Sequence, residues 1–140
     1  MGVSIYANGW NGREFHMGYR GFACLRQRIA DDFGIGDFYR SLESCHTDED
    51  FKAYNEALER IAAKIPWSEE DKDRLFDFLY APDGGYEVDY KTCSLILKVI
   101  ESDNGPVRMN YVAYSSPDDW ERFKDFLRDC VRYKRKMRWI

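Results

Sequence analysis

The stretch from Leu75 to Ile100 does most to constrain how this chain can fold. Its apolar residues follow helical spacing up to Leu79, stop at Pro82-Asp83-Gly84-Gly85, and resume at intervals of three and four residues from Cys93 onward. Proline and paired glycines end a helix, and Asp89 is a typical residue for the start of the next one. The stretch therefore predicts two apolar helices joined by a glycine turn, against which other segments can bury their apolar faces.

Other helices are indicated by apolar stripes that lie between capping and terminating residues. The stripe from Phe22 to Phe33 ends before Gly34, a typical C-terminal cap. Thr47 and Asp50 have the spacing of a capping box, ahead of a stripe that reaches Ile65. The remaining predicted helices are a short one over 37–44, one that starts at Ser68 and leads into the central stretch, and one that starts at Pro117 and runs into the C-terminal tail.

Alternating apolar and polar residues predict a small sheet. Val3–Ala7 and Glu14–Met17 both alternate, and the segment from Asn8 to Gly12 between them is rich in the asparagine and glycine that tight hairpin turns require. Residues 107–114 alternate as well and are a candidate third strand. The predicted fold is a mainly helical α+β protein of about five or six helices with an N-terminal β-hairpin, with residues 1–140 in a single globular domain.

Composition and cysteine usage bear on the compartment. The chain has 33% charged and 44% apolar residues, and no run approaches the roughly 20 apolar residues that span a membrane. Its first residues lack the basic and apolar regions of a secretory signal, and its four cysteines include no CxxC pair. We therefore expect a cytoplasmic protein with reduced, mostly buried thiols and no membrane partner.

Charge is distributed unevenly along the chain. From Arg128 to Ile140 six basic residues accompany one acid, Asp129, which gives +5, so the total of −4 leaves −9 on the rest. If the last helix continues through this tail, it brings together four cations and two rings: Arg128, Arg132, Arg135, Lys136, Tyr133 and Trp139. Such a helix docks on the acidic body or binds an acidic partner, and nucleic acid is one alternative.

The turn between the central helices suggests two metal-binding motifs. An EF-hand calcium loop would need glycine in place of Tyr86 and a closing glutamate in place of Thr92, so its turn and its strongest ligand are missing. The pattern Pro82-Asp83 followed by Asp89-Tyr90-Lys91 resembles that of metal-dependent nucleases, in which two carboxylates hold a cation and a lysine helps to activate water. A phosphodiesterase that uses Asp83, Asp89 and Lys91 is one alternative, although the spacing between its carboxylates is short.

Zinc or thiol chemistry would depend on Cys45-His46 together with residues elsewhere in the chain. Adjacent residues seldom both reach one metal ion, and structural zinc ligands usually come in close sequence pairs. A cysteine nucleophile needs a base nearby in space, which the sequence does not establish for His16 or His46. We predict no metal and no cofactor, and we expect Cys45, just before the Thr47 cap, to be the thiol most open to reaction.

Four segments are similar, in order, to small uncharacterised proteins of bacteria and their phages. They are MGVSIY at the start, GYRGF with LRQRIA, DFLYAPDGG with the CSLI helix, and WERFKDFL near the end. The resemblance covers most of the chain, and its motifs are structural. It implies an accessory, phage-linked or host-interaction role and assigns a function to no residue.

No set of residues has both the types and the spacing of an established active site. We therefore predict a non-enzymatic module that acts through contact with another protein. Its predicted contact surfaces are the loop around Trp10, the turn from Asp83 to Tyr86, and the basic C-terminal helix, since exposed rings in loops often mark such surfaces. The alternatives are the metal-dependent phosphodiesterase and nucleic-acid binding, and the oligomeric state stays open.

Overall fold

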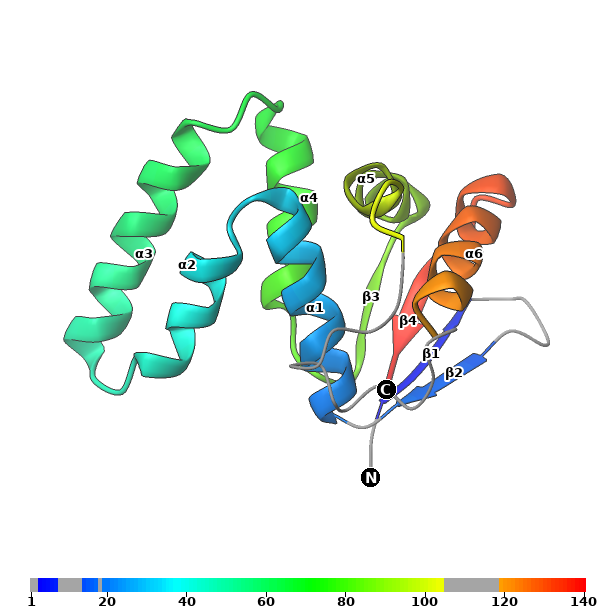
Figure 1. Cartoon of the computed structure of the whole chain (residues 1–140), viewed down its shortest axis with the longest axis horizontal. Helices are drawn as coiled ribbons and strands as arrows, with labels where there is room; N and C mark the ends of the chain where they lie inside the picture. Colours follow the sequence, from blue (N-terminus) through cyan, green and yellow to red (C-terminus); the bar gives the residue numbers. More distant parts are fainter. Residues whose placement is uncertain (1–2, 8–13, 18, 105–118) are drawn as a thin grey trace.

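A computed structural model describes residues 3–7, 14–17, 19–104 and 119–140 of the chain (Figure 1). The α-helices there are α1 (Tyr19–Phe33), α2 (Gly36–Arg40), α3 (Asp48–Ala63), α4 (Glu69–Tyr80), α5 (Tyr90–Ile100) and α6 (Asp119–Arg132), with a 3-10 helix, η1, over Ser41–Ser44. The strands are β1 (Val3–Ala7), β2 (Glu14–Met17), β3 (Tyr86–Val88) and β4 (Met137–Trp139). The predicted mainly helical α+β fold is confirmed. The loop 8–12 and the candidate strand 107–114 lie outside the described residues.

The four strands form an antiparallel sheet in the order β2-β1-β4-β3. The predicted hairpin is confirmed, with Ile5 of β1 opposite Phe15 of β2. Residues of β1 alternate between buried and half-buried, because successive side chains in a strand point to opposite faces. One face of the sheet therefore packs on the core.

The C-terminal tail departs most from the sequence prediction, because α6 ends at Arg132 and the chain returns as strand β4. Lys134 takes a positive φ of 52°, its N–H donates to the Val131 carbonyl at 3.3 Å, and the Arg135 N–H donates to the Cys130 carbonyl at 2.9 Å. This bond pattern is a Schellman motif, which ends a helix. The predicted continuous basic helix is wrong.

A glycine ends α1 in the same way, as the sequence predicts. Gly34 has a φ of 92°, its N–H donates to the Asp31 carbonyl, and the Ile35 N–H donates to the Ala30 carbonyl. Glycine adopts this left-handed conformation without a steric cost and is therefore recognisable in a sequence. Lysine at the corresponding position of α6 gives no such signal.

The predicted pair of central helices is confirmed as α4 and α5, but the segment between them is more than a turn. Gly85, with a φ of 73°, donates its N–H to the Trp139 carbonyl at 2.9 Å, and Tyr86–Val88 then pairs with β4. Tyr86 therefore lies on an edge strand, where the sequence analysis placed it in a turn.

Trp139 is fully buried between the sheet and two helices, contrary to its predicted role as an exposed ring for stacking. Its ring centroid lies 5.7 Å from that of Phe22 on α1 and 5.6 Å from that of Phe78 on α4. Its indole N–H donates to the Pro82 carbonyl at 2.8 Å. The C-terminal strand thus completes the core. Among the described helices, none is both long and apolar enough to cross a bilayer.

Residues 36–63, which comprise α2, η1 and α3, form a projection that we call the arm; the other described residues form the body. Figure 1 shows α3 standing apart from the sheet, with α1 and α4 between them. The predicted capping box of Thr47 and Asp50 starts α3, yet Tyr54 is the buried residue of that helix. The apolar stripe predicted the helix correctly, but most of the stripe is only half-buried and Phe51 is exposed.

Candidate functional site

Tyr86, a predicted contact residue, is half-buried and tied to α4. Its hydroxyl donates to Oδ1 of Asp77 at 2.7 Å, and its ring centroid lies 5.6 Å from that of Trp139. The hydrogen bond to the Asp77 carboxylate raises the pKa of Tyr86. Trp10, the other predicted aromatic contact, lies outside the described residues.

The two carboxylates of the nuclease hypothesis make separate structural contacts. Asp83 lies 3.6 Å from Nη2 of Arg26 on α1. Asp89 caps α5 by accepting from the Thr92 backbone N–H at 3.0 Å, and it pairs with Arg74 of α4 at 2.7 Å. Burial acts to raise the pKa of Asp89, but these contacts outweigh burial and the pKa is lowered. Asp89 therefore has a structural role as an ionised cap.

Lys91, the third residue of that hypothesis, is exposed on α5. Across the described ranges, no group of three or more histidine, cysteine, aspartate or glutamate side chains is arranged to hold a metal ion. Cys45 is half-buried, with Sγ 3.9 Å from the Ser41 carbonyl and 3.8 Å from the Asp50 carbonyl. The nuclease hypothesis stays a prediction.

Arg128, where the basic tail begins, pairs with acids of the same chain. Arg128 contacts Glu101 at 2.8 Å and Asp125 at 2.6 Å, and these carboxylates raise its pKa. Arg132 is exposed, and its guanidinium lies 5.3 Å from the ring centroid of Tyr133.

Beyond α6 the tail continues to contact the body. Lys136 and Arg138 both approach Glu87 of β3, at 3.6 and 3.5 Å. Arg135 is half-buried at the end of the Schellman motif. Two of the four predicted tail cations lie on α6 and two lie between α6 and β4, so the stripe expected for nucleic-acid binding is not formed. Nucleic-acid binding stays a prediction.

An open cleft of about 640 Å³ lies between α4, β3 and the start of α5. Five of its lining residues are acidic and two are basic: Glu70, Asp73, Asp77, Glu87 and Asp89 against Arg74 and Lys136. Arg74 contacts Glu70 at 2.8 Å as well as Asp89, and these two hydrogen bonds raise its pKa. The cations of the cleft are therefore engaged by its own acids.

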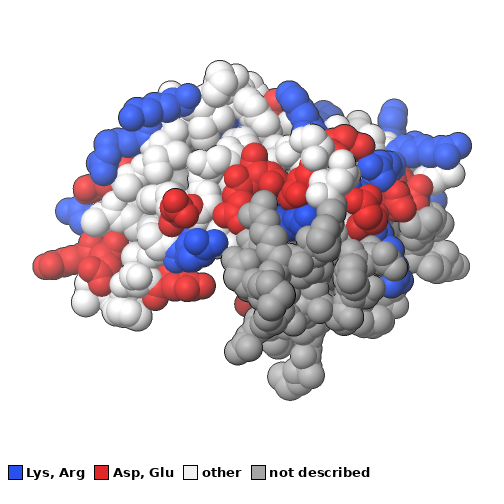
Figure 2. Space-filling view, viewed as in Figure 1, with Lys and Arg blue, Asp and Glu red and all other residues white. Residues whose placement is uncertain are grey.

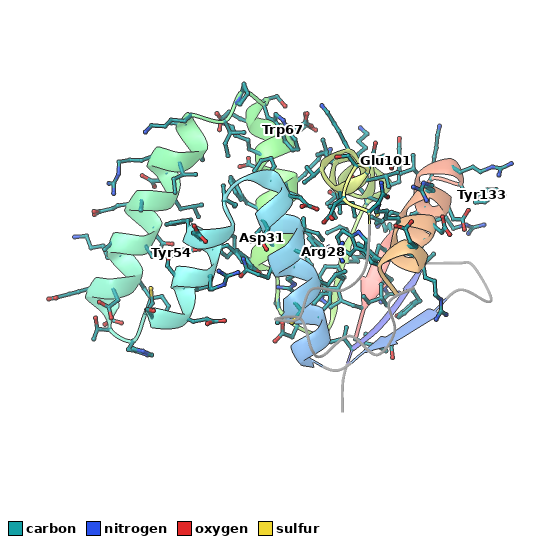
Figure 3. All side chains as sticks on the ribbon, viewed as in Figure 1. Arg28, Asp31, Tyr54, Trp67, Glu101 and Tyr133 are labelled. Atoms are coloured by element: carbon teal, nitrogen blue, oxygen red, sulfur yellow. The ribbon has the colours of Figure 1, made fainter. Side chains whose placement is uncertain are left out.

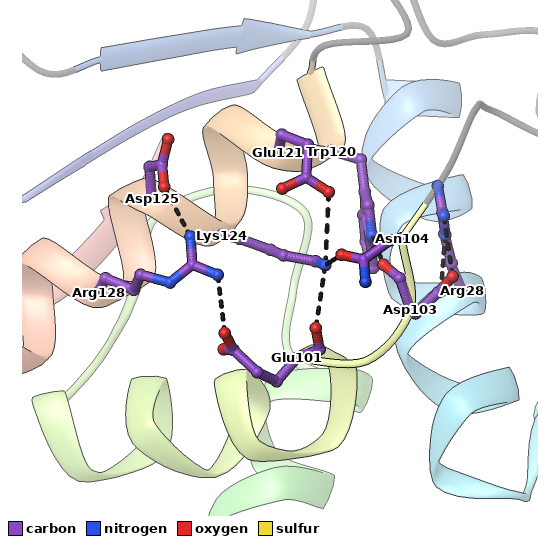
Figure 4. Close-up of polar contacts among 9 residues, drawn as sticks. All are labelled: Arg28, Glu101, Asp103, Asn104, Trp120, Glu121, Lys124, Asp125 and Arg128. Carbon is purple, nitrogen blue, oxygen red and sulfur yellow. Dashed lines mark hydrogen bonds and ion pairs between the residues drawn. The ribbon is translucent and has the colours of Figure 1, made fainter.

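A second polar cluster joins α1, the end of α5 and the start of α6 (Figure 4). Arg28 is 1% exposed, makes a bidentate contact with Asp103 at 2.9 and 3.0 Å, and lies 4.0 Å from the Trp120 ring centroid. Lys124 is fully buried and donates to Oδ1 of Asn104 at 2.8 Å. These buried and paired cations hold α1, the end of α5 and the start of α6 together.

Tyrosines join the arm to the body. Tyr54 of α3 lies between α3 and α2 (Figure 3), stacked on Phe38 with ring centroids 4.4 Å apart. Its hydroxyl is 2.5 Å from that of Tyr80 on α4, and burial together with this hydrogen bond raises the pKa of Tyr80. Lys72 of α4 also donates to the Ala62 carbonyl at 2.9 Å. The arm is thus held by a few specific contacts.

A groove of about 460 Å³ lies where the arm meets α1, and its volume falls in the range of ligand pockets. Its lining is partly apolar, since Ile35 is 7% exposed and Phe38 and Ile61 are half-buried. Two carboxylates, Asp31 and Asp37, line the same groove. The groove therefore combines an apolar surface with negative charge.

Two side chains fix the geometry of this groove. The Gln27 amide donates to Oδ1 of Asp31 and to the Gly36 carbonyl, both at 2.9 Å. Arg40 lies 4.0 Å from Asp31 and 3.7 Å from Asp37, so one cation serves both carboxylates. Among the described residues, the charged side chains at the groove are therefore these two carboxylates and Arg40.

Sequence reasoning did not identify this groove. A signal was present, because Gly34 and Gly36 flank Ile35 at the break between two apolar stripes. A side chain at position 36 would overlap the Asp31 carboxylate, so that glycine permits a close approach of backbone to side chain. The groove forms only because Ile61 of α3 lies beside residues 34–38 in the folded chain, which the sequence does not reveal.

The chain as a whole was also compared with known proteins. No protein-family model, no curated protein and no solved structure matches it.

Proposed function

We propose that this protein is a non-enzymatic interaction module that binds another protein through the arm. The observation that carries the proposal is the incomplete burial of α3, an amphipathic helix of 16 residues. Phe51, at its N-terminal end, is 44% exposed. Phe51 extends an apolar stripe in which Leu58, Ile61 and Ile65 are only half-buried, and apolar surface that is left uncovered in this way is a feature of contact surfaces.

The outer flank of α3 carries apolar side chains bordered by acidic ones. At about 100° per residue, Phe51 and Leu58 lie on the same flank of the helix, and Asp48 and Glu59 border it. Arg60 lies on the opposite side. Figure 2 shows uncharged surface across much of the visible face of the arm, with basic side chains at its upper left and both acidic and basic side chains toward its lower edge.

The contacts of the body also favour this surface over the surfaces expected from sequence. Arg128, Lys136 and Arg138 of the tail and Arg74 of the acidic cleft pair with acids of the same chain, so these cations serve internal stability first. The reduced thiols favour action in the cytoplasm. The proposed partner is therefore a cytoplasmic protein that binds the arm.

Site-specific photocrosslinking tests this proposal. A photoreactive residue replaces Asn55, which is exposed one helical turn after Phe51, and the crosslinking is done in cells that make the protein. We expect a discrete adduct that is lost in Phe51→Ser and kept in Tyr133→Ser, because Tyr133 is an equally exposed ring, at 51%, outside the arm.

Circular dichroism should show that both variants stay folded. An adduct that persists in Phe51→Ser, or one obtained from position 133 and not from position 55, would overturn the proposal.

A further inference from the structure

From the groove between the arm and α1, we infer that the partner presents a basic, amphipathic segment. The inference rests on the proposed function and specifies its chemistry. The segment places apolar side chains against Phe38 and Ile61 and a cation beside Asp37.

The apolar part of the groove can accept such side chains. Ile61 packs at the edge of the core and Phe38 stacks on Tyr54, so both are held in position before a partner arrives. Preorganised apolar surface binds more tightly than surface that must first be ordered. With about 460 Å³ of open volume, the groove is large enough for bulky side chains.

The charge of the arm determines which sign of charge the partner segment must carry. The arm has seven acidic and three basic residues, a net charge of −4 over residues 36–63. The Asp37 side chain is fully exposed, and its nearest cation, Arg40, is 46% exposed and shared with Asp31. A lysine or arginine of the partner can therefore approach Asp37, whereas an acidic segment would be repelled.

The acids on α3 extend this preference beyond the groove. Asp48 and Glu59 border the flank that carries Phe51, and Glu56 is exposed on the same helix. Asp48 and Glu59 lie on the side of α3 away from Ile61, so they add negative charge to the arm without lining the groove. Recognition of this kind places apolar anchors in a groove and charges around it.

Synthetic helical peptides test the inference directly. The probe is an amphipathic helix of leucine and lysine; its controls replace every lysine by glutamate or every leucine by alanine. We expect the leucine–lysine helix alone to bind by fluorescence anisotropy, with affinity that falls as salt is added. Amide shifts in NMR spectra should be confined to residues 31–40 and to α3.

Matched variants locate the site. Asp37→Asn should weaken binding about two- to fivefold, the effect of one exposed ion pair, and Ile61→Ser should weaken it further. Asp73→Asn, which removes an exposed acid of the cleft between α4 and β3, should leave binding unchanged.

Several results would overturn the inference. They are equal binding of the glutamate helix, unchanged affinity in Asp37→Asn, no binding of the leucine–lysine helix, or shifts centred on the cleft of Asp73. The two proposals fail separately. Absence of any photocrosslink from position 55 in the parent protein removes the arm as a contact surface, whereas a positive crosslink without peptide binding removes only the basic partner.

Discussion

The body and the arm use similar amphipathic helices in opposite ways. In the body, α6 buries Trp120, Phe123, Phe126 and Leu127 and even encloses the Lys124 ammonium group. In the arm, α3 is slightly longer and buries Tyr54. Full burial of a large apolar side chain contributes roughly 1.5–3 kcal/mol, and a half-exposed one contributes correspondingly less. Most of the stability should therefore come from the body, which leaves the arm available for contact.

Body and arm also differ in how their charged side chains are placed. The body encloses several charged groups that are paired within the chain, as Arg28 is with Asp103. Those of the arm are mostly exposed, as Asp37 is. Buried charges need fixed partners, whereas exposed charges remain free to meet new ones.

Breaking the buried ion pair of the body should have the largest effect. Asp103→Ala removes the carboxylate that contacts Arg28 on two nitrogens, and a guanidinium that is 1% exposed loses this pairing. We expect a loss of about 3–5 kcal/mol in the free energy of unfolding, measured by urea denaturation. The control Asp73→Ala removes an exposed acid and should change stability by less than about 0.5 kcal/mol. Equal effects would contradict the distinction between buried and exposed charges.

A change at the root of the arm should have an intermediate effect. Gly36→Ala adds a Cβ that overlaps the Asp31 carboxylate, so either the carboxylate or α2 must shift. Overpacking of this kind costs roughly 1–3 kcal/mol. Urea denaturation measures the loss, and NMR shifts should change along α2 and α3 and not along α6. A Gly36→Ala variant as stable as the parent would show that the close approach is unnecessary.

Loosening the tyrosine contact should separate the arm from the body. Tyr54→Phe removes the hydrogen bond to Tyr80, which contributes roughly 1 kcal/mol. We expect amides of α3 to exchange with solvent faster in the variant, while those of α5 and α6 keep their protection, because the arm opens locally. Tyr133→Phe, at a tyrosine that is 51% exposed and outside the arm, is the matched control. Uniform loss of protection over the whole chain would show that arm and body unfold as one unit.

The smallest effect should depend on pH. The folded-state pKa of Asp89 is lowered, so its contribution is present above the unfolded pKa of about 3.9 and is lost as the pH falls through the folded value. Asp89→Asn keeps a capping side chain and loses the charge that pairs with Arg74. Since 39% of the Asp89 side chain is exposed, we expect a cost below about 1 kcal/mol at pH 7.

The difference in stability between parent and variant should shrink as the pH falls below about 4. Urea denaturation at pH 7 and at pH 3 measures it, with Asp73→Asn as a control. A difference that grows toward low pH would reverse the assigned sign of the pKa shift.

The local part of the fold was predictable, and the candidate site was not. Thr47, Ser68 and Asp89 were expected to cap helices, and each accepts a hydrogen bond from a backbone N–H three residues on. The groove of the arm was missed because it forms between Ile35 and Ile61, which are far apart in the chain. Spacing along a sequence does not reveal which stripe remains uncovered after packing.

The sequence by itself determined where most helices begin and end, because a cap or a glycine terminator depends on residues within a few positions of one another. Only the tertiary structure decided that the basic tail becomes a strand, with Lys134 in the left-handed conformation and Trp139 in the core. Strand β4 exists because β1 and β3 supply its hydrogen-bond partners from both sides. Such pairing depends on segments distant in the chain, and the same is true of the surface that stays exposed on α3.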